Sequence, residues 1–137
     1  MRAFDPATDY PLASRRPDLI RTGSGLRLED LTLEELRAGR IAARDMRATP
    51  DTLRLQAEVA RAHGRAQLAA SLERAAELTA VPDDVVLDIY TALRPRRASA
   101  VELDAWAERL ESEYDAPAIA AFVREARHAY GERGLLV

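Results

Sequence analysis

An all-α fold is predicted by the sequence: a small helical bundle of about five helices with an irregular extended N-terminal arm. Hydrophobic residues make up 47% of the 137 residues but aromatic residues only 5%, and such an aliphatic composition favours helices over a β-sandwich. Beyond residue 30, apolar residues recur every three or four positions, as on one face of a helix. Residues 1–30 lack this period although they contain large apolar residues. We therefore expect an arm over 1–30 that packs on a partner, and a helical domain over 31–137.

Helix starts are marked by residues suited to capping. A short helix is expected after Thr32, which opens a capping-box pattern with a glutamate three residues on. Thr49 followed by Pro50 is typical of a second start, because proline fits the first helical position. Gly64 ends that helix, and the next is expected over about 65–80.

A helix is then expected between Pro82 and Pro95. It begins with two aspartates, which the positive end of the helix dipole favours. Its expected apolar stripe comprises Val86, Ile89, Tyr90 and Leu93.

The last two helices complete the expected bundle. Ser99 and Glu102 form another capping box, and Pro117 is expected to open the final helix. The two expected apolar faces are Leu103, Trp106, Leu110 and Tyr114, then Ile119, Phe122, Val123, Ala126 and Tyr130.

Charge and composition exclude several classes of function. The net charge is -3, which disfavours nucleic-acid binding because that binding depends on excess positive charge. The one basic cluster, Arg94–Arg97, lies between two helices, so it is expected to pair with carboxylates or to form a loop. The chain has no Cys, so disulfides and thiolate chemistry are excluded. No apolar run reaches the roughly 20 residues of a membrane helix.

No catalytic, cofactor-binding or metal-ligating residue is predicted. Glu125 and His128 have the Glu-x-x-His spacing of di-iron bundles, but a second such pair is missing because Ala60 stands three residues before His63. The glycine-containing stretch 22–25 is expected to be a turn, since no strand precedes it as a phosphate loop requires. Two classes of function remain: an accessory subunit of a larger enzyme, or a free-standing helical interaction or regulatory module.

Several segments together resemble one family over nearly the whole chain from residue 9. They are DYPL (9–12), DLTLE (30–34), DMRATPDTLRLQAEVARAHGR (45–65), RAAELTAVPDDVVLDIYTALRPRR (74–97) and AAFVREARHAYGERGLL (120–136). They resemble the small, or gamma, subunit of adenosylcobalamin-dependent diol and glycerol dehydratases. Ser71, Thr91 and Trp106 depart from the residues usual in that family, which affects packing more than the assignment.

This resemblance implies a non-catalytic subunit. The family enzymes are dimers of heterotrimers that convert propanediol, glycerol or ethanediol to aldehydes by a radical mechanism. The large subunit holds the active site, and adenosylcobalamin lies between the large and medium subunits. This chain alone is expected to bind no cofactor, and it does not determine which diol is used. The expected location is the cytoplasm, either free or within a bacterial microcompartment, although few residues precede DYPL to carry a targeting signal.

The resemblance also suggests a role for the arm. The segment 10–25 is expected to fold onto the large subunit, with Pro11 and Pro17 reducing the entropy lost on docking. The residues expected at this interface are Tyr10, Leu12, Arg15, Arg16, Leu19 and Ile20.

Overall fold

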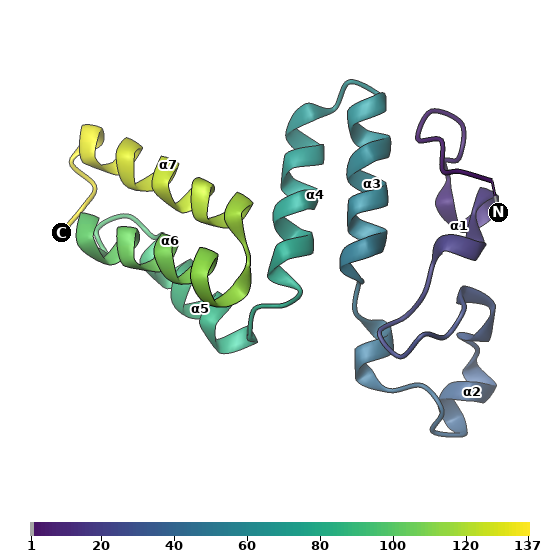
Figure 1. Cartoon of the computed structure of the whole chain (residues 1–137). Helices are drawn as coiled ribbons and strands as arrows, with labels where there is room; N and C mark the ends of the chain where they lie inside the picture. The colour runs from purple at the N-terminus through teal and green to yellow at the C-terminus, as the bar shows by residue number, and fades with distance from the viewer. Residues whose placement is uncertain (1) are drawn as a thin grey trace. The chain divides into compact units, whose positions relative to one another are not determined.

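A computed structural model describes residues 2–137 and confirms the all-α fold class (Figure 1). Apart from one isolated antiparallel bridge between Arg21 and Arg27, every regular element in this range is helical. The chain divides into two compact units, Met1–Ala76 and Glu77–Val137. No helix within residues 2–137 has the length and apolarity to cross a membrane.

The first unit begins with short helical turns and ends in a helical hairpin. Its elements are α1 (Leu12–Arg15), η1 (Pro17–Leu19), η2 (Leu28–Asp30), α2 (Leu33–Arg37), η3 (Ala43–Met46), α3 (Pro50–Ala62) and α4 (Ala66–Leu78), the last of which continues into the second unit. The predicted N-caps are confirmed: the Thr32 hydroxyl accepts from the N–H of Glu35, and that of Thr49 accepts from the N–H of Thr52. The full capping box at Thr32 does not form, because the Glu35 carboxylate pairs with Arg40 instead.

The helices α3 and α4 form a hairpin (Figure 1). Its core consists of very small side chains. Ala57, Ala60 and Ala69 are buried there, and Leu72 packs against them. The predicted stop is confirmed, since Gly64 has a φ of 72°, a left-handed conformation that glycine adopts without steric cost. Methyl groups bury little apolar surface, so this core contributes little to stability.

The second unit contains the larger core. Its further helices are α5 (Asp83–Ala92), α6 (Ala100–Tyr114) and α7 (Pro117–Arg133). The fully buried side chains at its centre include Leu103, Leu110 and Val123. The predicted capping box at Ser99 and Glu102 is confirmed, because each side chain accepts a hydrogen bond from the backbone N–H of the other.

The start of α7 is held by a residue distant in sequence. Pro117 is its first residue, as predicted, but the preceding residue makes no side-chain cap. Instead, the Glu77 carboxylate accepts hydrogen bonds from the N–H groups of Ala118 and Ile119, at 2.9 and 2.8 Å. This carboxylate satisfies two backbone donors that have no partner within the helix.

On the predicted apolar faces of α5 and α7, two residues are exposed, so the prediction is wrong for them. Tyr90 is 67% exposed and Phe122 is 41% exposed. In α5 the buried positions are Val85 and Ile89, so the face that meets the core is rotated away from Tyr90. An apolar period locates a helical face only approximately when large side chains lie at both of its edges.

Candidate subunit interface

The N-terminal arm is folded onto itself around one buried carboxylate. Asp9 is 1% exposed, and its carboxylate accepts hydrogen bonds from the Asp5 N–H at 2.9 Å and from Arg16 at 3.0 Å. Arg2 is a third donor to the same group. A buried carboxylate with charged and backbone donors fixes the path of the chain around it.

The guanidinium of Arg16 links several parts of the same segment by hydrogen bonds. Its guanidinium donates to the backbone carbonyls of Arg2 and Ala3, at 3.1 and 3.3 Å. It also makes two bonds of 3.0 Å to the Asp18 carboxylate. The arm thus has a defined shape without a helical period, because polar side chains satisfy its backbone.

The hydrogen bonds of Asp9 make the order of the arm dependent on pH. The Asp5 N–H, followed by Arg2 and Arg16, lowers the pKa of Asp9 from 3.8 to about 2. Because the pKa in the folded state is the lower one, the stabilisation from Asp9 is fully present above about pH 4 and is lost as the pH falls through about 2. We expect amide signals of the arm to lose their native shifts over this range in NMR spectra.

The Asp9→Asn variant is the control for this titration. This substitution removes the titrating carboxylate, so the arm should be less ordered at neutral pH. Its amide shifts should then change less as the pH is lowered. Native arm shifts that persist unchanged at pH 2 in the wild-type chain would contradict the role given to Asp9.

A second buried carboxylate fixes the turn over 22–25. Asp45 is 4% exposed and accepts from both hydroxyls of the turn, those of Ser24 and Thr22, and from the N–H groups of Ser24 and Ala42. These donors, the Ser24 hydroxyl first and the Thr22 hydroxyl next, hold the pKa of Asp45 well below its usual range. The stretch is therefore a turn, as predicted, but its anchor at Asp45 was not predicted.

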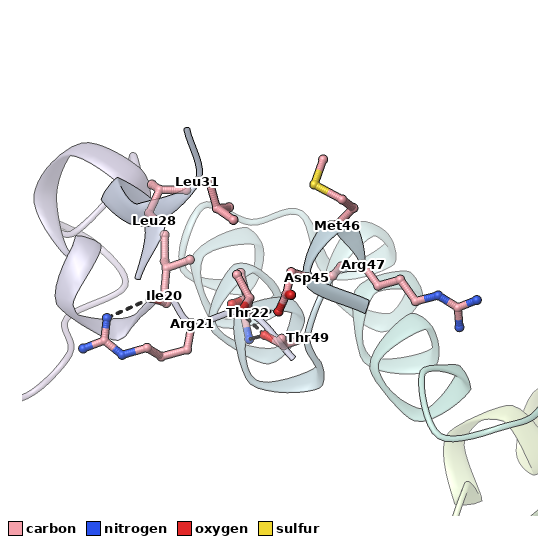
Figure 2. A pocket seen from close by; sticks show the side chains of 11 residues that line it. Ile20, Arg21, Thr22, Leu28, Leu31, Asp45, Met46, Arg47 and Thr49 are labelled. Atoms are coloured by element: carbon pink, nitrogen blue, oxygen red, sulfur yellow. Dashed lines mark hydrogen bonds between the residues drawn. The ribbon is translucent and has the colours of Figure 1, made fainter. Parts of the chain in front are cut away.

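A hollow lies beside this turn (Figure 2), and polar side chains such as Arg21, Asp45 and Arg47 line it together with apolar ones. Its volume is about 210 Å³, and its apolar lining includes Ile20, Leu28, Leu31 and Met46. Met46 is 72% exposed, although a fold usually buries methionine. We call these four residues the arm hollow.

The short helix α2 adds exposed apolar residues to the same unit. Leu33 is 64% exposed and Leu36 is 50% exposed. Single exposed apolar residues are common, but an apolar hollow accompanied by further exposed leucines is typical of a protein–protein contact.

The structure places the six predicted interface residues at different depths. Leu12 and Arg16 are buried within the chain itself, each 5% exposed. The others reach the surface: Tyr10 and Arg15 are exposed, and Leu19 and Ile20 are half-buried. Leu12 and Arg16 can thus shape the arm, whereas the other four are available to a partner.

A larger groove runs along the α3–α4 hairpin. Its volume is about 620 Å³. We call it the hairpin groove, and its lining residues are Tyr10, Gln56, Val59, Ala60, His63, Arg65, Leu68 and Leu72.

The Glu125–His128 pair does not form part of a metal site in the described chain. Across residues 2–137, no three His, Cys, Asp or Glu side chains gather as metal ligands would. The exposed imidazole of His128 lies 3.5 Å from Glu132 instead.

A family model described as dehydratase small subunit matches residues 6–137. The chain belongs to this family. Two curated relatives are propanediol dehydratase small subunits, from Citrobacter freundii at 55% identity and from Salmonella typhimurium at 53%. Each match covers 126 residues, which is 92% of this chain and 73% of the relative. The family resemblance predicted from the sequence is therefore confirmed, and the chain is a subunit of a multi-subunit dehydratase.

Proposed function

We propose that this chain is the non-catalytic small subunit of an adenosylcobalamin-dependent diol dehydratase. In this role it supports the assembly of the large subunit, which converts 1,2-diols to aldehydes by a radical mechanism. The relatives are named propanediol dehydratase small subunits, so propanediol is the first substrate to test. The complex would be a dimer of heterotrimers with large and medium subunits, in the cytoplasm or in a microcompartment.

The arm hollow is the observation that best supports an assembly role. It combines exposed apolar side chains, Met46 above all, with a backbone that Asp9 and Asp45 hold in place. A surface that is already ordered loses less entropy on binding. The large subunit would therefore cover Tyr10, Leu19 and Ile20, with Arg15 at the rim.

We propose the two parts that the sequence predicts, although Leu31 and Met46 of the hollow belong to the second part. Residues 1–30 would form the arm that packs on the large subunit, and residues 31–137 would form the helical domain that supports it. The free-standing regulatory module remains the alternative, and it predicts a chain that functions without either partner.

The chain's own residues do not suit a corrinoid. The hairpin groove offers a single imidazole, His63, and its Nδ1 is already 2.9 Å from the Val59 carbonyl oxygen. The remaining lining is mainly aliphatic. We therefore assign adenosylcobalamin to the other subunits, since a cofactor performs its chemistry where it is held and oriented.

Deletion of residues 2–28 tests this function. The truncated chain is expected to lose co-purification with a tagged large subunit, because it lacks the arm and half of the hollow. Ile20→Glu should weaken retention in the full chain by placing a charge in the hollow. Absorption spectra should show corrinoid bound to the wild-type complex but not to the isolated small subunit.

Val101→Glu is the matched control. Val101 is 77% exposed and lies in the second unit, so a charge there should leave co-purification unchanged. Full retention of the truncated chain would refute docking through the arm. A wild-type chain that never co-purifies with a large subunit would refute the proposed function and favour the regulatory module.

A further inference from the structure

The hairpin groove is a second apolar surface, separate from the arm hollow. Val59 and Leu72 lie along it, and Leu68 is 44% exposed at its edge. Tyr10, which is 60% exposed, brings an aromatic ring from the arm. Ala60 and Leu72 belong both to the small core of the hairpin and to the lining of the groove, so the groove borders directly on that core.

A helix is the occupant that such a surface fits. An amphipathic helix can lie along a groove on the flank of two neighbouring helices and fill it with residues spaced three and four apart. A volume of about 620 Å³ holds several aliphatic side chains. None of the eight lining residues is acidic.

A positive charge at one end of the groove indicates that the partner carries a negative one. Arg65 is exposed, and its guanidinium forms no ion pair with any side chain of residues 2–137. His63 lines the groove near it, and its Nδ1 is directed to the Val59 carbonyl. An unpaired guanidinium beside an apolar surface favours a carboxylate on the partner, since such pairs form bidentate hydrogen bonds.

The first unit as a whole carries a net positive charge, as Arg65 does. It contains 13 arginines and 11 carboxylic residues, whereas the second unit contains seven arginines and 12 carboxylic residues. The net side-chain charges are thus +2 and -5. An acidic partner segment is therefore attracted to the first unit and repelled by the second.

We propose that the hairpin groove binds an amphipathic helix of a partner dehydratase subunit, with a carboxylate of that helix paired to Arg65. This inference rests on the proposed function, because it takes the occupant from the same complex. It adds a second contact to the one made by the arm.

Leu68→Glu and Arg65→Glu in the full chain test the groove. Each is expected to reduce the small subunit retained on a tagged large subunit by at least about tenfold, the loss typical of a removed interface anchor. Glutamate at position 68 lies in the first turn of α4, where the helix dipole favours an anion, so the helix should persist. Circular dichroism of the isolated variants checks this.

Leu87→Glu and Arg65→Lys are the controls. Leu87 is a leucine on α5 with 64% exposure, and its replacement should leave retention unchanged. Arg65→Lys keeps the charge and should retain more than Arg65→Glu. Retention of Leu68→Glu at the wild-type level would overturn the groove contact, while loss in Ile20→Glu would at the same time uphold the proposed function.

A photo-crosslinker at position 68 of the small subunit in the assembled complex identifies the occupant. The expected product joins this position to a peptide of a partner subunit that contains Asp or Glu. A crosslink to residues 77–137 of the same chain, to a second copy of it, or to no peptide would overturn the proposal.

Discussion

Replacing Leu110 by alanine is expected to lower the free energy of unfolding of the second unit by about 2–5 kcal/mol. Leu110 belongs to α6, and its side chain is completely buried in the largest core cluster. Truncation removes apolar contacts and leaves a cavity that neighbouring helices fill only in part. The single Trp106 packs against this cluster, so urea unfolding followed by its fluorescence measures the effect.

Leu87→Ala provides the comparison for this measurement. Leu87 is 64% exposed, and its truncation should change the free energy of unfolding by less than about 0.5 kcal/mol. If Leu110→Ala and Leu87→Ala had the same small effect, the core formed by α5, α6 and α7 would not be the source of stability in this unit.

The elements that could be predicted from the sequence are those with local signals. Thr32, Thr49 and Ser99 cap helices within three residues of themselves, and Gly64 and Pro117 mark a helix end and a helix start. Such signals depend only on neighbouring backbone groups, so a sequence reveals them without knowledge of the fold.

The features that were missed depend on contacts distant in sequence. Glu77 caps α7 from 41 residues away, and Asp45 holds Ser24 from 21 residues away. Nothing local distinguishes these two carboxylates from the many exposed ones. The exposure of Tyr90 was missed for a related reason, because the direction from which other helices approach α5 decides which of its residues are buried.

The candidate interface was only partly predictable. Apolar residues without a helical period predict an interface in the segment 10–25, but they do not indicate how deeply each side chain is buried. Arg16 is among the residues predicted at the interface, yet it is buried beside Asp9. The exposed Met46 was not singled out, since a methionine in a sequence usually predicts burial.

The two units should differ widely in stability when the small subunit is isolated. The core cluster of the first unit consists of three alanines with Leu72 packed against them. That of the second unit has eleven buried residues, including the large side chains of Leu103, Leu110 and Ile119. A buried methyl contributes about 0.8 kcal/mol and a large aliphatic side chain about 1.5–3 kcal/mol, so the second unit gains far more from its core.

Hydrogen exchange on the isolated full chain should reveal this difference. Amides of α6 and α7 are expected to exchange at least about 100-fold more slowly than those of α2 and the arm, which open locally. In the assembled dehydratase, protection of the arm and of the α3–α4 hairpin should rise towards that of α7, because a partner that binds only the folded form stabilises it.

The second unit is the internal control in this experiment, since its protection should change little on assembly. Uniform protection across both units in the isolated chain would contradict the difference inferred from their cores. Protection of the arm that stays low in the complex would show instead that no partner covers Ile20 and Met46. From the exposed apolar side chains of the first unit and its small core, we therefore expect this unit to gain more stability on assembly than the second unit does.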